Sequence, residues 1–564
     1  MFTNFYTFFI SYIFIICSSL GYGFLIEKFV NKSNSIRNLG YIGLSGVFFL
    51  IIYSYLSSLF IGHGLIHNSI LLGFGFLIFL IKTNFLKNLL SKDYSLLFLI
   101  FAVLIFGLFI FKTHDDFSYY HFQYSYYLTQ QKVVLGIGNF DLGLRTPSSI
   151  FYLNSLFYLP IIKFFTFQIT PALILGFCNL LIILKIKRDL NENRYNFLTI
   201  YNLLIFIFIN TFFYRLSEHG TDKSAQILVL ILFSEILLFT NFKVNFEKNL
   251  SKMLLLIGLI ISFKAFYILY AVFFILVLYR LLSLKLKFNQ LLKFFSKNIY
   301  SLGFISLFFL IMIHNFYSSG CLLYPVSVTC FDENLWGIKV KEVIELNNWY
   351  EQWAKGGAGP NFRVENPEIY IRNFNWVSNW FNIYFFNKIS DFILGLSILT
   401  FVTFLVLKSK KKEPIKKRNK IFLIFLIVIL LIEWFWNHPA LRYGGYCLIA
   451  SLVFIFFSIL MEKFKNEKKI LGRKLFYLIL ITFVIFSSRN FQRIQYEIVN
   501  YNYEPLNEFY YNMEKRNFNL QNTISNLIAN YKNCEKLNEM CDNSLNEIIK
   551  VDKKNEKYIF YREK

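Results

Sequence analysis

Long apolar runs, each followed by a short polar segment, recur along the chain from residue 5 to residue 488. Many of them approach the roughly 20 residues that an α-helix needs to cross a bilayer. The pattern predicts helices over residues 5–26, 39–61, 66–81, 94–111, 170–186, 196–213, 225–240, 253–263, 265–280, 299–316, 390–407, 420–436, 443–461 and 475–488. The region 148–186 admits one span or two, and 253–280 admits one long helix or two short ones separated by Lys264. We therefore predict an all-α polytopic integral membrane protein with about 12–14 transmembrane helices.

Lysine and arginine are concentrated in every second loop between these runs. Of the 58 basic residues, 32 fall in the loops 27–38, 82–93, 185–195, 241–252, 280–297, 408–420 and 462–474. The positive-inside rule places such loops in the cytoplasm. The outer loops are then 112–169, 214–224, 317–389 and 437–442, with residues 148–166 as a juxtamembrane or re-entrant helix in the first of them.

Composition excludes two classes of protein. The chain is 56% hydrophobic and only 16% charged, with a mean hydropathy of +0.48, whereas a soluble domain carries about 25% charged residues. The net charge of +24 is typical of nucleic-acid binding only where the basic residues form one stripe, and here they form loop clusters. The first apolar run lacks a positively charged segment before it and a clear cleavage site, so we predict an uncleaved membrane helix.

The tail differs from the rest of the chain. Residues 489–564 are rich in Asn, Glu and Lys, with apolar residues at helical spacing. We predict a transmembrane domain over 1–488 and a small, mostly helical extracytoplasmic domain over 489–564. Four cysteines fall in predicted outer segments, and even pairing in an oxidising compartment predicts the disulfides Cys321–Cys330 and Cys534–Cys541, with free buried thiols as the alternative.

The first outer loop begins with candidate catalytic residues. Asp115 and Asp116 follow an apolar run directly, next to His114. A carboxylate at a membrane interface is costly unless it is paired or bound, and it can serve as a general base or help to bind a divalent cation. A helix over 117–130 would place Tyr120 on the same face as Asp116, with Gln123 one turn further along. The alternative is a solvated helix cap followed by an interfacial aromatic belt.

Other predicted outer segments supply cations and further acids. Lys264 interrupts an apolar stretch and needs an acid or a phosphate as partner. A lipid phosphate would be held by such cations, with arginine able to bind it through two hydrogen bonds. The residues concerned are Arg145, Arg215, Glu218, His219, Asp222, Lys223, Lys264, Glu433, His438 and Arg442. Taken singly, each is explained better by contact with lipid headgroups or by snorkelling.

Spaced motifs give the chain a resemblance to a known class. An Asp-Asp pair after an early spanning helix resembles the first-loop signature of GT-C-type glycosyltransferases. More narrowly, the patches resemble those of a family of bacterial integral membrane proteins of GT-C-like shape. The matching residues are Asp116, Tyr120, His121, Gln123, Gly136, Gly138, Asn139, Arg145, Ser148, Ser149 and Phe151, then Ser319, Gly320, Leu323, Tyr324, Pro325, Trp336, Trp353 and Ala354, and finally Pro439, Arg442 and Tyr443.

The resemblance implies transfer of a sugar from a polyprenyl-phosphate-linked donor at the outer face of a bacterial inner membrane. Asp116 would act as the base, and Arg145, Lys264 and Arg442 would hold the leaving phosphate. The remaining candidates are Asp115 and His121 for catalysis, and Tyr120, Gln123, His219, Asp222 and His438 for substrate binding. No Cys-x-x-Cys motif or His/Cys cluster indicates zinc, and a divalent cation stays open as a cofactor.

Two other functions share much of this pattern. A transporter or flippase of a lipid-linked saccharide is one, and Glu235, inside an apolar run, favours it. The chain has no internal repeat, however, and few other charges inside its apolar runs. A polymerase or ligase of surface polysaccharide is the other, and its chemistry is that of the glycosyltransferase.

Overall fold

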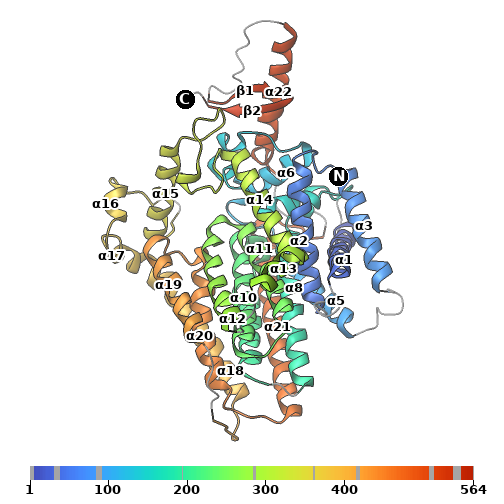
Figure 1. The fold of residues 1–564 in the computed structure, drawn as a ribbon, viewed down its shortest axis with the longest axis vertical. Coiled ribbons are helices and arrows are strands. Elements are labelled where there is room, and N and C mark those ends of the chain that lie inside the picture. The colour runs from blue at the N-terminus through green and yellow to red at the C-terminus, as the bar shows by residue number, and fades with distance from the viewer. Residues whose placement is uncertain are drawn as a thin grey trace.

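The chain is an all-α polytopic membrane protein. The computed structural model describes residues 5–30, 38–83, 92–192, 195–283, 288–359, 362–414, 420–506, 513–537 and 548–562. In these residues eight helical segments have the length and composition to cross a membrane (Figure 1). Six of them are single helices: Phe5–Phe29 (α1), Leu39–Ser58 (α2), Leu65–Thr83 (α3), Asp222–Asn241 (α10), Ile299–Ser319 (α14) and Lys468–Tyr501 (α21). The segment Phe164–Asn191 ends in α8 (Ile169–Asn191). The segment Val377–Leu407 consists of α17 (Val377–Trp380), a π-helix (Phe381–Ile389) and α18 (Ser390–Leu407).

Shorter helices complete the bundle and its loops. Four are apolar: Phe197–Phe212 (α9), Ala265–Leu281 (a 3-10 helix, Ala265–Phe273, and most of α12, Phe274–Ser283), Ile421–Asn437 (α19) and Gly445–Met461 (α20). The others are α5 (Lys92–Leu104), α6 (Phe122–Gln130), α7 (Ser149–Leu156), α11 (Phe246–Phe263), α13 (Phe288–Lys297), α15 (Val340–Lys355), α16 (Pro367–Ile371) and α22 (Asn519–Leu537). Strands β1 (Lys550–Lys554) and β2 (Lys557–Tyr561) form an antiparallel hairpin.

The structure decides both alternatives that the sequence leaves open. Within 148–186 only α8 is long enough to cross a bilayer, because α7 has eight residues. In 253–280 the chain forms two helices: α11 ends at Phe263, and Lys264 takes an extended conformation before the 3-10 helix begins.

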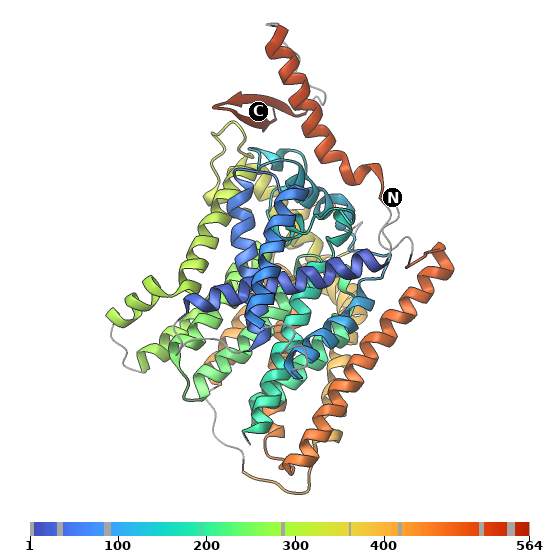
Figure 2. The same ribbon diagram turned by 90° about the vertical axis from the view of Figure 1, so that its right-hand side faces the viewer.

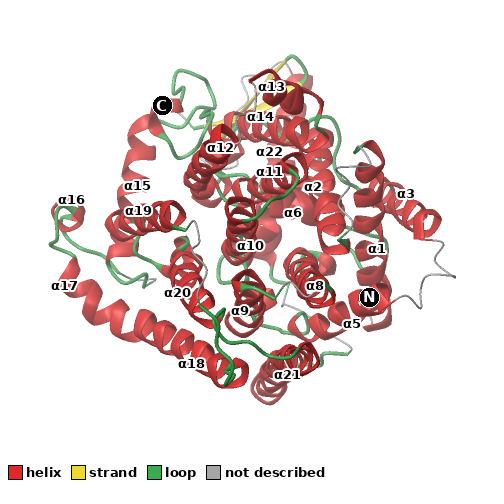
Figure 3. Cartoon of the chain, turned by 60° about the horizontal axis from the view of Figure 1, so that its bottom comes forward, coloured by secondary structure: helices red, strands yellow, loops and turns green. Residues whose placement is uncertain are grey.

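Burial separates an inner group of helices from an outer ring. In the most apolar stretch of α2, α8 and α10, 78–94% of the residues are buried, against 28–33% in α3, α14, α18 and α21. Figure 3 shows α8, α9, α10 and α11 inside the ring. The outward faces of the ring carry large exposed apolar side chains, such as Phe74 and Leu77 of α3 and Phe401 and Leu405 of α18. Apolar surface of this extent is typical of contact with lipid rather than water.

Helix α1 lies crosswise to the long axis of the molecule, end-on in Figure 1 and lengthwise in Figure 2. It passes α2 and α3 at points of backbone contact where glycines leave room. A Cβ atom on Gly46 of α2 would lie 1.7 Å from the carbonyl oxygen of Ser19, and one on Gly21 of α1 would lie 1.8 Å from that of Gly75. Small residues permit such close crossings of membrane helices.

We expect Gly46→Leu to loosen this crossing and to lower the melting temperature of the purified protein. Overpacking costs about 1–3 kcal/mol where side chains can adjust, and here the obstacle is backbone. Gly73→Leu in α3 is the matched control, because nothing lies within 4 Å of a Cβ atom there. Thermal unfolding in detergent would measure both, and equal melting temperatures would contradict the crossing.

Two of the predicted cytoplasmic loops and the first predicted outer loop lie at opposite ends of the long axis of the molecule (Figure 1). At the basic end, residues 408–414 and 462–467 pair, with the Glu413 N–H donating to Lys463 O at 2.9 Å. At the other end, which we call the site end, the first outer loop meets residues 317–337 and the hairpin (Figure 1). There the Asn139 side chain donates to the carbonyl oxygens of Phe560 at 3.0 Å and Trp336 at 3.2 Å.

Cysteine labelling of intact cells tests which end faces outward. Asn366→Cys and Glu556→Cys place exposed thiols at predicted outer positions, and Lys411→Cys places one at the basic end. We expect an impermeant maleimide to modify the first two in intact cells and the third only after permeabilisation. The buried free thiols Cys17, Cys178 and Cys447 should stay unreactive. Labelling of Lys411→Cys in intact cells would show that the basic end of the bundle faces outward.

Most of the described tail is helical, and a β-hairpin follows its last helix. Helix α21 runs without a break past residue 488, where the sequence predicts a domain boundary, and the chain ends in a hairpin. The hairpin is not predicted from the sequence because its two turn residues, Asn555 and Glu556, lack the usual Asn-Gly signal although both have positive φ. Contacts distant in sequence also hold it, since the Phe560 N–H donates to Leu135 O at 2.9 Å.

The first predicted disulfide, Cys321–Cys330, is confirmed. It closes a small loop directly after α14. Cys541, half of the second predicted pair, lies outside the described residues.

Candidate functional site

Side chains from four separate segments meet at the site end of the bundle. The segments are the first outer loop, the start of α10, the break after α11, and the turn between α19 and α20. The residues brought together are His114, Asp116, Tyr120, His121, Asp222, Lys264 and Arg442. We call this group the outer cluster. All but His114 are among the predicted site residues.

A π-helical turn, Phe117–His121, arranges the first-loop members. Asp116 precedes the turn, and its carbonyl oxygen accepts from the N–H of His121 at 3.4 Å. The Tyr120 hydroxyl donates to Asp116 Oδ2 at 3.3 Å, so the predicted shared face is confirmed. Single π turns are rare and are frequent at functional sites.

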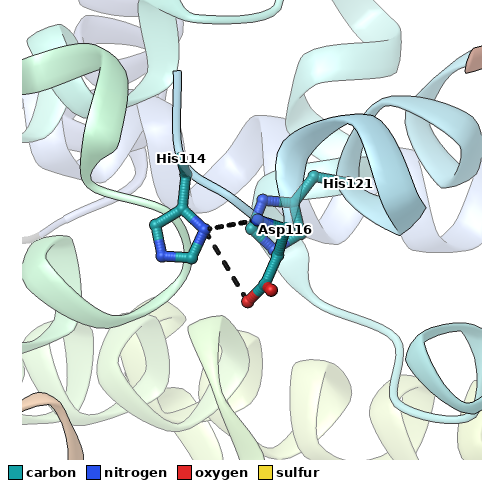
Figure 4. A group of neighbouring side chains, drawn as sticks. All are labelled: His114, Asp116 and His121. Carbon is teal, nitrogen blue, oxygen red and sulfur yellow. Dashed lines mark hydrogen bonds and ion pairs between the residues drawn. The ribbon is translucent and has the colours of Figure 1, made fainter. Parts of the chain in front are cut away.

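His114 is fixed against the same turn (Figure 4). Its backbone N–H donates to Ser217 O at 3.1 Å, and its Nδ1 accepts from the Asp116 N–H at 3.1 Å and lies 3.7 Å from Asp116 Oδ2. Gly220 backs the imidazole: its φ of +55° favours glycine, and a Cβ atom there would lie 2.9 Å from the ring. The loop before α10 therefore determines where His114 sits.

Arg442 links the two carboxylates of the cluster. Its Nε donates to Asp222 Oδ2 at 2.9 Å, and its Nη2 donates to Asp116 Oδ2 at 3.3 Å. The Lys264 ammonium pairs with the other oxygen of Asp222. The side chain of Asp222 is 4% exposed and that of Asp116 is 32% exposed. Asp222 therefore neutralises buried charge, whereas Asp116 can be reached from solvent.

Protonation follows from burial and these pairs. Burial raises the pKa of the Asp116 carboxyl, but His114 and Arg442 lower it further, so the net pKa is below its ordinary value. Burial lowers the pKa of His121 to about 3, and it also lowers the pKa of His114. At neutral pH the cluster presents an ionised carboxylate beside the neutral imidazole of His121. Such a group can accept a proton or bind a cation.

Aromatic side chains hold the segment that carries Arg442. The guanidinium lies 5.5 Å from the ring centre of Trp353 and 5.8 Å from that of Tyr443, and the Lys264 ammonium lies 4.7 Å from Tyr443. The indole N–H groups of Trp380 and Trp434 donate to the carbonyl oxygens of Pro439 at 2.8 Å and Ala440 at 2.9 Å. The turn is thus positioned independently of any ligand.

An apolar cavity of about 420 Å³ adjoins this turn. Its walls come from the π-helix before α18, from α18 itself, and from α19 and α20. Trp380 and Trp434, which bond the Arg442 turn, also line the cavity. A hydrocarbon group in the cavity would therefore lie beside the polar cluster.

Two of the other predicted residues have hydrogen-bond partners outside the outer cluster. Arg145 is buried, and it donates to Glu342 at 2.8 Å and to Gly138 O at 3.2 Å. His219 donates through Nε2 to Phe213 O at 2.7 Å and supports the loop behind His114.

Gln123 bonds the chain around α22 rather than Asp116: its Oε1 accepts from the Leu520 N–H at 3.3 Å. His438 packs against Phe266 and Tyr443 at the rim of the outer cluster, and burial lowers its pKa to about 4. Asp115 is exposed, and no hydrogen bond or ion pair joins it to the described residues.

Sequence reasoning missed one residue that supports the outer cluster and one that pairs with a predicted site residue outside it. Glu342 pairs with Arg145, and Gln226 of α10 donates to Arg442 O at 3.1 Å. Glu342 lies in a polar helix among other acids, so nothing in its neighbourhood marks it. Gln226 is an amide within an apolar run, and that exception is a usable signal because a buried amide needs a partner.

Comparison with known proteins identifies one family for the chain. No curated protein and no solved structure matches the chain. A family model, described as a domain of unknown function (DUF8201), matches residues 6–449. The match covers more than half of the chain and every residue of the outer cluster. The chain belongs to the DUF8201 family.

Proposed function

We propose that the protein is a GT-C-like membrane glycosyltransferase that takes a sugar from a polyprenyl-phosphate-linked donor at the outer face of a bacterial inner membrane. One observation carries the proposal: Asp116 is an ionised, solvent-accessible carboxylate beside a fixed arginine, at one end of a membrane bundle. The acceptor hydroxyl would lose its proton to Asp116. The acceptor oxygen would form a bond to the sugar, and the bond from the sugar to the donor phosphate would break, with inversion.

The leaving phosphate needs cations, and Arg442 retains donors for it. A guanidinium has five N–H groups, and two nitrogens of Arg442 bond carboxylates. Lys264 lies on the other side of Asp222 and adds a second positive charge. The pair with Asp222 keeps both cations in place before the donor arrives, which lowers the cost of ordering them.

The cavity under the Arg442 turn suits the lipid part of such a donor. Only apolar and aromatic side chains line it, and two of its tryptophans bond the turn directly. A phosphate at Arg442 and an isoprenoid chain in the cavity would belong to one molecule. This placement supports a lipid-linked donor over a soluble nucleotide sugar.

A transporter or flippase of a lipid-linked saccharide is the second candidate, and one observation favours it. Glu235 is fully buried within α10, where it pairs with Lys185 of α8 and with Lys252 of α11 at 3.4 Å. Ionisable groups inside membrane helices frequently mark transport paths. A polymerase or ligase of surface polysaccharide would use the outer cluster as a glycosyltransferase does.

The test uses purified protein in lipid nanodiscs with a panel of polyprenyl-phosphate-linked sugars. Transfer is measured as release of polyprenyl phosphate together with labelled acceptor. Movement of intact donor between leaflets, without release, would favour the transporter. If donors of each sugar class bind and none is cleaved, the glycosyltransferase proposal is wrong.

A further inference from the structure

Three side chains of the outer cluster have the composition of a metal site. His114, Asp116 and His121 each offer one ligand atom, and these atoms all lie within 4.8 Å of one another. Figure 4 shows the three side chains gathered at the π-helical turn. The extra residue in that turn brings His121 back beside Asp116. Two histidines and an acid from eight consecutive residues thus form one compact donor set.

An unsatisfied nitrogen gives an independent indication of a ligand. His121 is 5% exposed, and its Nε2 is buried without a hydrogen-bond partner among the described residues. A buried polar atom left unpaired is destabilising, and such atoms in proteins call for an explanation. A bound cation would use the lone pair that the protein leaves unpaired.

We propose that His114, Asp116 and His121 bind a divalent transition-metal ion, with zinc as the first choice. Imidazole nitrogens favour zinc and its neighbours, whereas magnesium and calcium favour oxygen ligands throughout. Three protein ligands leave a position for water or substrate, as in catalytic zinc sites. Binding of the metal ion does not depend on the proposed function. The catalytic role of the ion rests on that function, because the ion would lower the pKa of a hydroxyl bound to it.

Nearby charges set the cost of binding. In the structure, His114 Nδ1 accepts from the Asp116 N–H, and Asp116 Oδ2 accepts from Arg442 at 3.3 Å. A metal would compete with both contacts. Arg442 can release Asp116 without becoming an unpaired charge, because its shorter bond, at 2.9 Å, is to Asp222. Asp222 thus makes it feasible for a second cation to lie beside Arg442.

Equilibrium binding of Zn²⁺ to the full-length protein tests the proposal. The protein, purified without a histidine tag and stripped with chelator, is titrated with Zn²⁺ and separately with Mg²⁺. We expect about one Zn²⁺ per chain and at least tenfold weaker binding of Mg²⁺. His121→Gln, His114→Gln and Asp116→Asn should each weaken Zn²⁺ binding at least tenfold. Asp115→Asn and His67→Gln are the matched controls and should bind as the wild type does, because Asp115 is exposed without a contact to the cluster and His67 lies in α3, where its Nε2 hydrogen-bonds with the Tyr53 hydroxyl at 2.8 Å.

Cobalt supplies a second measurement that does not depend on any one variant folding. Bound Co²⁺ should give visible d–d bands, and these should change in His114→Gln even if His121→Gln proves unstable. Absence of Zn²⁺ binding by the wild type would overturn the site, as would equal binding in all three variants or equal binding of Mg²⁺. Zinc binding without sugar transfer would reject only the proposed function, and transfer by metal-free protein would reject only the catalytic role of the ion.

Discussion

Asp116→Asn should lower the turnover number for sugar transfer by about 10²–10⁴-fold, the usual loss on removing a general base. The amide has nearly the same shape as the carboxylate, and its oxygen can still accept from Tyr120 and Arg442. What it loses is the negative charge, which takes the proton and would also bind the proposed metal ion. The donor KM should therefore change little, because the donor phosphate binds through the cations.

Initial rates against donor concentration separate the two effects. Asp115→Asn is the control: it makes the same chemical change one residue away, at an exposed position with no contact to the cluster. We expect it to keep at least half of the wild-type rate. If Asp116→Asn is fully active, the base assignment is wrong, and if the double variant also transfers sugar normally, the cluster is not the active site.

The sequence predicts the parts of the fold that local pattern determines. The predicted apolar runs correspond to helices throughout the described residues, since hydrophobic length alone specifies a membrane helix. The charge pattern also predicts one side for residues 408–414 and 462–467, which pair in the structure. The crosswise course of α1 is not predictable in this way. It depends on Gly21 meeting Gly75 and on Gly46 meeting Ser19, and such contacts between distant residues leave no local signal.

The contacts of the candidate site are likewise predictable only where their residues are close in the sequence. The spacing of four residues predicts that Asp116 and Tyr120 share a helix face, and the two side chains are in contact. The bond from Arg442 to Asp222 joins residues 220 positions apart, and that from Arg145 to Glu342 spans 197. Sequence reasoning placed Arg145, Lys264 and Arg442 together as phosphate ligands. The structure gives each a carboxylate partner, and it places Lys264 and Arg442 together while Arg145 lies outside the outer cluster.

We expect loss of the Asp222 carboxylate to lower the stability of the protein, whereas loss of the Asp116 carboxylate lowers the rate of sugar transfer. Asp222→Asn leaves Lys264 without its carboxylate and Arg442 with only the longer bond to Asp116. Breaking a buried ion pair on one side typically costs about 3–5 kcal/mol. We expect a loss near the lower limit, about 3 kcal/mol, because both cations are partly exposed. Thermal unfolding of the purified variant would measure it.

A second substitution shows whether charge balance is the cause. Lys264→Met removes the cation that Asp222→Asn leaves unpaired, while Arg442 keeps Asp116 as its partner. The double variant should therefore be more stable than Asp222→Asn alone, with a coupling free energy of about 0.5–3 kcal/mol, as residues in direct contact show. Asp222→Glu, which retains the charge, should lose less than Asp222→Asn. If the two losses simply add, Asp222 stabilises the protein through packing, and the cations do not depend on it.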